Sequence, residues 1–409
     1  MARRIHVIQP LSAISSIDLA REEAVRCELG AVARVWDATL KLYQTAVYPA
    51  ISICVRHQGR IVLNRAVGHS SGNGPDDELE VAKKIVTPDT PFCIFSASKA
   101  ITAMVVHLLD DRGLLHIDDR VAEYIPEFAQ QGKEWVTIRH VLSHRSGIPS
   151  FAGDNNVQLL YRWDEVVQRL CETRPVSKAG RRLAYHAITG GFILGEIVRR
   201  VTGKDIRTVL AEEILSPLSF KGLNYGVPVD ETENVAKSYF TGHRVPPVLR
   251  HVVRNALGVS FAEAARIGNE PAYLTTIVPS GNVVGTAEEL SRFFQLLLDG
   301  GTQNGVRIFD PRTIRRAINE TAYLEMDLTI GLPVRYGVGL MLGSERFSPF
   351  GPKTSNAYGH LGFINILGWA DPDRQITVGL LTSGKPFVSS HLVRLFQLLR
   401  TIGVSFPVA

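Results

Sequence analysis

Apolar residues recur at helical spacing in four stretches of the chain, the pattern of amphipathic helices. These stretches are residues 17–46, 99–112, 190–201 and 390–403. The second is the strongest, because Gly113 follows it directly and glycine commonly ends a helix. Its apolar positions are Ile101, Met104, Val105, Leu108 and Leu109. The patterns predict helices near both ends of the chain and in its middle.

Other stretches alternate apolar and polar residues, which is typical of β-strands. Residues 50–67 alternate on both sides of Gln58-Gly59, a pair that favours a tight turn. Near the C-terminus, residues 361–370 and 375–382 also alternate, and the turn-forming sequence Asp-Pro-Asp-Arg separates them. The sequence therefore predicts one antiparallel hairpin near each end of the chain.

Strands at both ends and helices in the middle predict an α+β fold. Its antiparallel sheet is built from both termini and flanked by helices, and a mainly helical lobe is inserted. The 409 residues exceed the size at which one core stops growing. We expect one unit over 1–409, with a sheet lobe from 17–95 and 300–409 and a helical lobe from 96–299. Residues 230–285 show little periodicity, so they could form a lid or a wall of a cleft between the lobes.

Composition excludes several functional classes. The net charge of +5 comes from 45 basic and 40 acidic residues without a long basic run, so no nucleic-acid partner is expected. No stretch approaches the about 20 apolar residues of a membrane span, and residues 1–16 lack the apolar core of a signal peptide. We therefore expect a cytoplasmic protein. The four cysteines form no C-x-x-C pair, which favours free thiols.

The sequence Ser96-Ala97-Ser98-Lys99 begins the strongest predicted helix. A serine hydroxyl is a poor nucleophile until a neighbouring base takes its proton, and a base three residues later lies on the same helix face. A buried lysine at a helix N-terminus can lose its proton near neutral pH and serve as that base. Alone, the pattern is also compatible with a helix cap followed by an incidental lysine.

Gly68-His69-Ser70-Ser71-Gly72 is a rival, because it matches the G-x-S-x-G elbow of α/β-hydrolases. That elbow needs a strand, a sharp turn and then a helix. The residues that follow, Asn-Gly-Pro-Asp-Asp, cannot start a helix directly. We therefore interpret this segment as a loop after the hairpin.

Further segments, in their order along the chain, settle the choice. Residues 137–149 resemble "LLSHTSGLP", residues 185–205 resemble "YSNxGYxLLGxIIExVTG", and residues 358–383 resemble "GHTGFxxxxWxDPxxxxxxxLLTN". Together with residues 92–103, 279–301 and 336–342, they resemble the serine β-lactamase and penicillin-binding-protein superfamily from about residue 47 to 383. Within it, the chain looks most like the family VIII carboxylesterases and the relatives of class C β-lactamases. The resemblance implies the β-lactamase/transpeptidase-like version of the predicted fold.

The resemblance also implies catalytic roles. Ser96 would form the acyl-enzyme, and Lys99 would help to deprotonate it. Tyr185, in the first position of the family's Y-x-N motif, would be the base for attack and the acid toward the leaving group. A tyrosine can do this only if nearby cations such as Lys99 lower its pKa from about 10.

The third motif of the family, K-T-G in lactamases, would be His360-Leu361-Gly362 here. The backbone N–H groups of Ser96 and Phe363 would form the oxyanion hole. Gly362 would leave room for the acyl group against the strand. Lys353-Thr354-Ser355 also resembles K-T-G, but its Gly, Pro, Ser and Asn neighbours predict a surface loop.

Two departures from the lactamase pattern bear on the substrate. Ala187 replaces the asparagine of Y-x-N, which in lactamases contacts the amide side chain of the substrate. His360 replaces the lysine that pairs with the lactam carboxylate, and a histidine is charged only part of the time near neutral pH. Both changes favour uncharged esters.

We therefore expect a serine esterase that cleaves short-chain or small-alcohol esters through an acyl-enzyme on Ser96. A β-lactamase, a D-amino-acid peptidase and an acyltransferase of the same fold are alternatives, and a non-catalytic binding module is one from another class. The retained Ser96, Lys99 and Tyr185 argue against the last. The partner would be a small-molecule ester, with no cofactor or metal; His140 and His144 are interpreted as structural. The sequence leaves the oligomeric state open.

Overall fold

One large sheet joins the two ends of the chain. The structure is a computed structural model that describes residues 2–26, 28–78, 80–151, 157–247, 250, 254, 258–363, 365–387 and 390–408. The strands follow the order β1-β3-β2-β16-β15-β14-β13-β12-β11. They are β1 (Ser15–Ile17), β2 (Ala50–His57), β3 (Arg60–Ser71), β11 (Ala322–Met326), β12 (Pro333–Tyr336), β13 (Met341–Leu342), β14 (Tyr358–Gly362), β15 (Ile366–Asp371) and β16 (Ile376–Thr382). β2 pairs with β16 antiparallel, with Cys54 opposite Gly379, so the predicted sheet built from both termini is confirmed.

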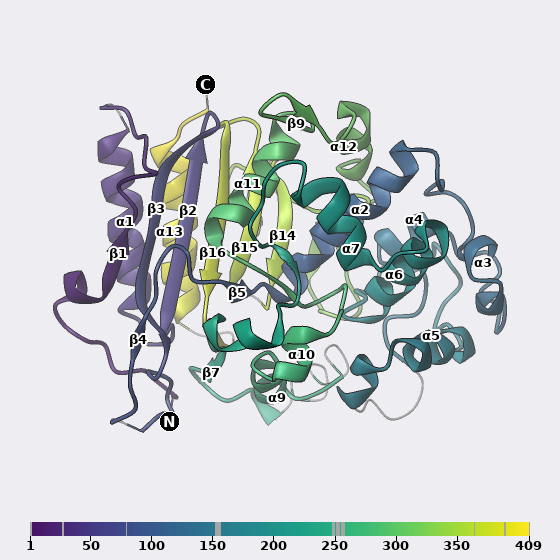
Figure 1. The fold of residues 1–409 in the computed structure, drawn as a ribbon, viewed down its shortest axis with the longest axis horizontal. Helices are drawn as coiled ribbons and strands as arrows, with labels where there is room; N and C mark the ends of the chain where they lie inside the picture. Colours follow the sequence, from purple (N-terminus) through teal and green to yellow (C-terminus); the bar gives the residue numbers. More distant parts are fainter. Residues whose placement is uncertain are drawn as a thin grey trace.

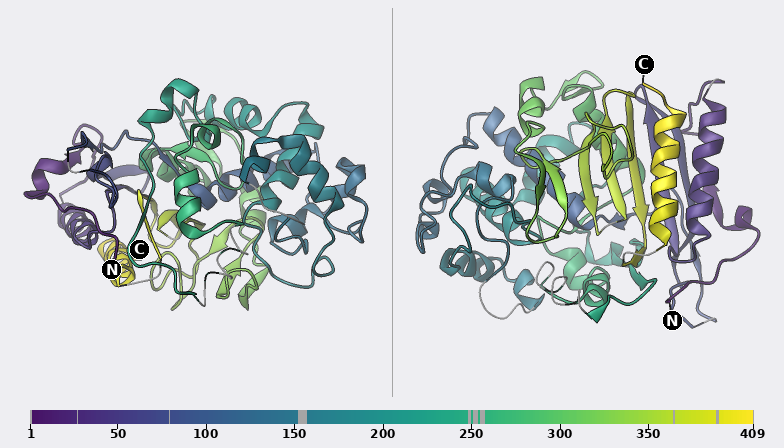
Figure 2. Two further views of the ribbon diagram at one scale, coloured as in Figure 1. Left: turned by 90° about the horizontal axis from the view of Figure 1, so that it is seen from below. Right: turned by 180° about the vertical axis from the view of Figure 1, so that it is seen from behind.

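Helices cover both faces of this sheet. On one face α1 (Leu29–Tyr43) and α13 (His391–Ser405) lie side by side, and on the other lies α11 (Ala287–Leu298), as Figures 1 and 2 show. A Cβ at Gly379 would overlap the carbonyl of Ala287, so glycine lets the start of α11 approach β16 closely. Each face therefore has its own apolar core.

The helical part surrounds α2 (Ser98–Asp111), which is buried from Ser98 to Asp110. Around it lie α3 (Val121–Tyr124), α4 (Ile138–Leu142), α5 (Trp163–Glu172), α6 (Thr189–Thr202), α7 (Ile206–Leu210) and α12 (Pro311–Ala317). Two short helices, α9 (Phe261–Ile267) and α10 (Pro271–Thr275), lie at the lower edge of Figure 1. The division of the chain into two lobes stays a prediction.

Short strands connect these layers. β5 (Phe92–Cys93) and β6 (Asn224–Tyr225) both pair with β8 (Val283–Gly285). β7 (Tyr239–Thr241) pairs in parallel with β17 (Gly384–Pro386), and β4 (Lys84–Ile85) pairs with β3. A separate hairpin joins β9 (Thr302–Gln303) and β10 (Val306–Arg307). The stretch 230–285, in which the sequence showed little periodicity, thus contributes β7, β8, α9 and α10 as well as loops.

Several predicted elements are confirmed. The hairpin over 50–67 forms as β2 and β3, and its turn residues Gln58 and Gly59 both have positive φ (51° and 80°), as a tight type I′ hairpin turn needs. The helices predicted over 99–112, 190–201 and 390–403 appear as α2, α6 and α13, within two residues at each end. Long periodic segments with clear ends are the most predictable from sequence.

Two predicted elements are wrong in extent. The helix expected over 17–46 begins only at Leu29, because backbone groups before it bind β3 instead: Asp18 N–H donates to Asn64, and Glu23 N–H donates to Ile61. The strand expected over 361–370 is split, since the chain reverses between Gly362 and Ile366. That reversal matters for the active site.

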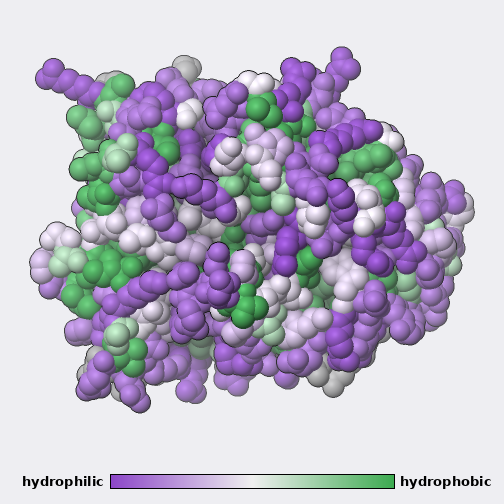
Figure 3. All heavy atoms as spheres, viewed as in Figure 1, coloured by the Kyte–Doolittle hydropathy of each residue, from purple (hydrophilic) through white to green (hydrophobic). Residues whose placement is uncertain are grey.

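The surface shown in Figure 3 mixes polar and apolar residues, and polar ones predominate. Scattered apolar side chains of this kind are normal for a folded protein. Of the helices within the described ranges, none combines the length and the apolar character needed to cross a membrane. Cys54, Cys93 and Cys171 are buried free thiols, as expected; Cys27 lies outside the described residues.

Candidate active site

Ser96 lies where a strand turns sharply into α2. The chain leaves β5 and makes one 3-10 turn over Phe95–Ala97, and α2 begins at Ser98. Phe95 has a φ of 46°, a region that bulky residues rarely adopt, and such strain is often found at functional sites. Ser96 is partly exposed although its neighbours on both sides are buried. The turn thus presents one hydroxyl at the surface of a buried segment.

Lys99 is 8% exposed, and its amine contacts Ser96 directly. Nζ lies 3.2 Å from Ser96 Oγ, 2.7 Å from the carbonyl oxygen of Ala187 and 2.9 Å from that of Ser280. Burial lowers the pKa of Lys99 well below its ordinary value of 10.5, because the charged form loses its hydration. A neutral amine has two hydrogens and one lone pair. Its two N–H groups fit the two carbonyls, which leaves the lone pair for the hydroxyl of Ser96.

Two loops hold these carbonyls in place. Ala187 lies just before α6, two residues after Tyr185. Ser280 lies just before β8, and its side chain is bound to the start of α6: Oγ donates to Ile188 O (2.9 Å) and accepts from Gly191 N–H (3.0 Å). The lysine is therefore held by backbone that α6 fixes.

Tyr185 reaches the same serine from the other side. Its hydroxyl lies near enough to Ser96 for that side chain to influence its pKa, and Lys99 Nζ lies 4.9 Å from the centre of its ring. Burial, the largest influence, raises the pKa of Tyr185 above 10, and the interaction with Ser96 only partly opposes this. The sequence-based expectation that Lys99 lowers this pKa therefore does not fit the surroundings. An uncharged phenol beside an uncharged amine is the form that burial favours.

Residues of β14 complete the arrangement. A Cβ at Gly362 would overlap the carbonyl oxygen of Ile94, so glycine is needed for β14 to pass the turn that carries Ser96. This close approach of two backbones, rather than room for an acyl group, explains the glycine. Phe363 follows with a φ of 46°, and its ring lies 5.1 Å from that of Phe95. The segments carrying the Ser96 and Phe363 N–H groups are thus brought together, as expected for an oxyanion hole.

His360 is 2% exposed and points toward Tyr185, with the ring centres 6.4 Å apart. Burial and the nearby Lys99 lower its pKa to about 3, so the ring is uncharged at neutral pH. Its Nδ1 lies 2.7 Å from the carbonyl oxygen of Leu361, so Nδ1 carries the hydrogen and donates it. Sequence reasoning allowed a partial charge here, and the structure makes this histidine a neutral side chain.

Sequence reasoning missed the residues that hold Tyr185. Asp327, fully buried, accepts the Tyr185 N–H on Oδ1 at 3.1 Å. The ring of His144 lies 4.7 Å from that of Tyr185 and 5.0 Å from that of Tyr336. His144 was interpreted as structural, yet it packs on the candidate acid. Asp327 lies outside the motifs that the sequence offered, and the motif over 137–149 does not indicate that its His144 packs on Tyr185.

The two other segments that resemble catalytic motifs, residues 68–72 and 353–355, do not have the structure that their motifs require. Ser70 is 3% exposed within β3, and its hydroxyl donates to Lys84 O at 3.2 Å, so it is no nucleophile elbow. Lys353-Thr354-Ser355 forms a loop as expected, although Thr354 itself is buried. His140, by contrast, caps α4, where its Nδ1 accepts the Thr137 N–H. Among the described residues, no three His, Cys, Asp or Glu side chains group as metal ligands.

Comparisons with known proteins agree with this geometry. Residues 36–400 match the Beta-lactamase family. "Esterase/beta-lactamase LipL" of Mycobacterium tuberculosis is 29% identical over 306 residues, which cover 72% of this chain and 69% of the relative. The crystal structure of a family VIII carboxylesterase is similar with a TM-score of 0.75 and 27% identity, covering 90% of this chain and 96% of the other. A penicillin-binding protein homologue from Caulobacter crescentus has a TM-score of 0.77 and 26% identity, covering 92% and 97%.

Proposed function

The chain belongs to the Beta-lactamase family and is a serine ester hydrolase of that fold, and from this premise we propose that it cleaves short-chain or small-alcohol esters through an acyl-enzyme on Ser96. One observation carries the proposal. The amine of Lys99 is buried and held by two carbonyls, and its remaining position faces the hydroxyl of Ser96. A base prepared in this way has a use only if the serine gives up its proton.

Acylation begins with Lys99 as the base. As Ser96 Oγ attacks the ester carbonyl, its proton moves to Nζ of Lys99 and the carbonyl oxygen becomes an oxyanion. The N–H groups of Ser96 and Phe363 donate to that oxyanion, and one such donor contributes about 3 to 4 kcal/mol in other enzymes. The uncharged Lys99 thus replaces the histidine that other serine hydrolases use.

Tyr185 then protonates the leaving group. Its phenol keeps its proton at rest because burial raises its pKa. When the tetrahedral intermediate collapses, the C–O bond to the alcohol breaks, and the phenol donates its proton to the departing oxygen. The ammonium of Lys99, 4.9 Å from the tyrosine ring, returns a proton to it. Deacylation follows the same proton path in reverse. Water attacks the acyl-enzyme in place of the alcohol and passes its proton to Tyr185, Lys99 returns a proton to Ser96, and the acid is released.

The lining favours esters over β-lactams. Ala187 has a methyl side chain, so it offers no side-chain amide to a lactam substrate. Its backbone carbonyl accepts from Lys99 and is not free to take that role. His360 carries no charge at neutral pH with which to pair a lactam carboxylate. These two positions support the choice of an uncharged ester group at the reacting centre.

Replacement of the nucleophile tests the proposal. We expect Ser96→Ala to lose about a thousandfold or more of p-nitrophenyl butyrate hydrolysis. A fluorophosphonate should label Ser96 in the unchanged protein, as identified by mass spectrometry of the labelled peptide. Ser70→Ala is the matched control and should stay active and labelled. Labelling of another serine, or faster turnover of a chromogenic cephalosporin than of the ester, would contradict the assignment.

A further inference from the structure

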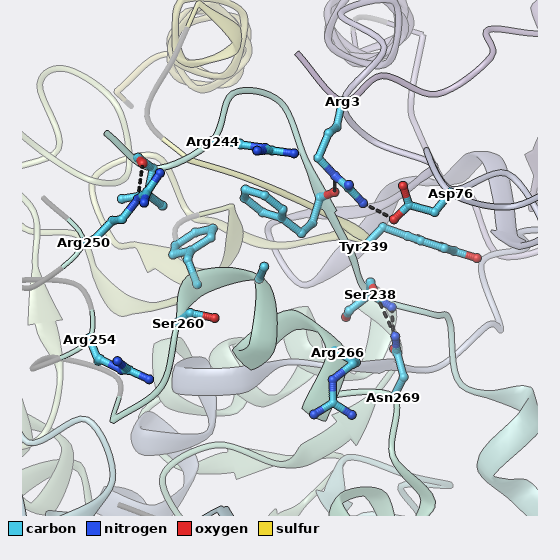
Figure 4. A pocket seen from close by; sticks show the side chains of 14 residues that line it. Arg3, Asp76, Ser238, Tyr239, Arg244, Arg250, Arg254, Ser260, Arg266 and Asn269 are labelled. Carbon is cyan, nitrogen blue, oxygen red and sulfur yellow. Dashed lines mark hydrogen bonds and ion pairs between the residues drawn. The ribbon is translucent and has the colours of Figure 1, made fainter. Parts of the chain in front are cut away.

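A second cavity lies beside the candidate active site. It has a volume of about 690 Å³ and is built from distant segments: the N-terminal residues, β7 and the chain after it, and α9 (Figure 4). Its charged lining residues are Arg3, Arg244, Arg250, Arg254, Arg266 and Asp76. Five arginines therefore face one aspartate.

Among the described residues, carboxylates pair with only two of these five arginines. Asp76 pairs with Arg3, whose Nε also donates to Phe240 O at 3.0 Å. Arg266 pairs with Glu270 at 2.5 Å, yet its side chain is 64% exposed. Among the described residues, no carboxylate pairs with Arg244, which Figure 4 shows extending toward Arg3. Like charges repel, so such a gathering is stabilised by an anion that binds among them.

Aromatic rings form the apolar part of the cavity and connect it to the reacting serine. Phe240 and Phe261 both line it, with ring centres 6.0 Å apart. Phe261 also packs on Phe363, with ring centres 4.6 Å apart, and Phe363 packs on Phe95 at 5.1 Å. Phe95 directly precedes Ser96. Phe261 is thus a wall shared by the cavity and the oxyanion segment.

We propose that this cavity binds an anionic group, a carboxylate or a phosphate, that the ester substrate carries away from the bond to be cleaved. This inference rests on the proposed function, because it names the substrate class of the same site. Arginine keeps its charge at physiological pH, and its planar fork of N–H donors matches both anions. The rings would cover the apolar linker between the anion and the ester, and the volume suits a small-molecule site. The uncharged ester group of the substrate would bind at Ser96, and the anionic group at the other end of the same substrate would bind to the arginines.

Matched pairs of esters test this proposal. On the acyl side, mono-p-nitrophenyl suberate is compared with its methyl ester, which lacks the free carboxylate. On the alcohol side, 4-acetoxyphenyl phosphate is compared with phenyl acetate. We expect kcat/KM to be about tenfold or more higher for the anionic member of at least one pair. The advantage should shrink between 50 and 500 mM NaCl, because salt screens charges that solvent reaches.

The double variant Arg244→Gln/Arg266→Gln should remove most of that preference for the anionic ester. The control Arg394→Gln/Arg400→Gln removes the same charge from exposed positions on α13 and should keep the preference. Equal or lower kcat/KM for both anionic esters would overturn the inference, as would an equal loss of preference in both double variants. Hydrolysis of the neutral esters reports on the esterase assignment separately, so failure of one proposal is distinguishable from failure of the other.

Discussion

At the scale of single residues, Lys99 determines the chemistry of the site. No carboxylate among the described residues pairs with it, and a buried charge without a partner is costly. Burial therefore favours the uncharged amine, in keeping with the lowered pKa of Lys99. The same burial that makes the amine a base must reduce the stability of the fold, because the unfolded chain would keep that proton.

This cost gives a prediction for Lys99→Met. Between the lowered pKa of Lys99 in the folded chain and its ordinary value of 10.5, the unfolded state binds one more proton than the folded state. The folded wild type therefore gains stability as pH rises through this window, by up to about 1.4 kcal/mol per pH unit, and the methionine variant lacks this gain. In urea unfolding from pH 7 to 10, the stability of the wild type should rise progressively relative to that of the variant.

The control for this experiment is Lys178→Met, an exposed lysine whose replacement should give a curve parallel to that of the wild type. If the Lys99→Met curve is also parallel, Lys99 carries its proton in the folded protein, and the proposed base is wrong.

Gly362 gives a second prediction at this scale. Gly362→Ala places a Cβ against the Ile94 carbonyl and must displace β14 from the turn that carries Ser96. Because Phe363 N–H moves with the strand, we expect kcat for p-nitrophenyl butyrate to fall about 10- to 100-fold with little change in KM. Gly403→Ala, a helix position with space for a methyl group, is the control and should keep full activity. Unchanged kcat in Gly362→Ala would remove Phe363 from the oxyanion hole.

The sequence predicted Ser96, Lys99 and Tyr185 because each lies in a short local motif with a fixed spacing. It could not predict that the carbonyls of Ala187 and Ser280 hold the lysine, since every residue offers a carbonyl and only the fold selects two. The sequence could not predict the protonation state of Tyr185 either, because it depends on burial in the fold rather than on the residues adjacent in sequence.

At the scale of elements, the turn after β11 positions Tyr185. Asp327 Oδ1 accepts N–H groups from Tyr185 (3.1 Å), Thr329 (2.8 Å) and Ile330 (3.2 Å). One carboxylate oxygen thus ties its own turn to the segment that carries the phenol. Asp327 touches no reacting atom, so we assign it a positioning role.

Asp327→Ala should leave these N–H groups without an acceptor, at about 1 to 3 kcal/mol for each one that stays buried. Tyr185 would then lose its fixed place, so we expect a lower kcat with a nearly unchanged KM. Asp327→Asn keeps an oxygen acceptor and should restore most of kcat. If Asp327 had a purely structural role, the loss of activity in each variant would instead follow the fall in its melting temperature.

The successes and failures in predicting elements have a common cause. The β2–β3 hairpin and α2 follow from local patterns and turn residues, and both formed as predicted. The predictions for the segment before α1 and for the strand that ends at Gly362 were wrong, because tertiary contacts determine the conformation of both. The segment before α1 is hydrogen-bonded to β3. The chain reverses after Gly362 because β14 pairs with β15.

At the scale of the whole molecule, the site depends on segments that only the sheet brings together. Ser96 follows the N-terminal strands, and Phe363 lies between two C-terminal ones, so β2 pairing with β16 connects the two halves of the proposed oxyanion hole. α13 packs on the opposite face of that sheet from α11. A change in α13 can reach Ser96 only through the stability of the sheet.

Leu398 on α13 tests this dependence, because it is fully buried in the core of that opposite face. Leu398→Ala should cost about 2 to 5 kcal/mol, whereas Val393→Ala, 60% exposed on the same helix, should cost less than about 0.5 kcal/mol. In urea, we expect Leu398→Ala to shift the loss of fluorophosphonate labelling and the loss of helical circular dichroism to the same lower concentration. If labelling instead persisted to the wild-type concentration while the dichroism fell early, the helices around Ser96 would be stable without the sheet. The two lobes would then unfold separately, and the sheet would not be what brings the site together.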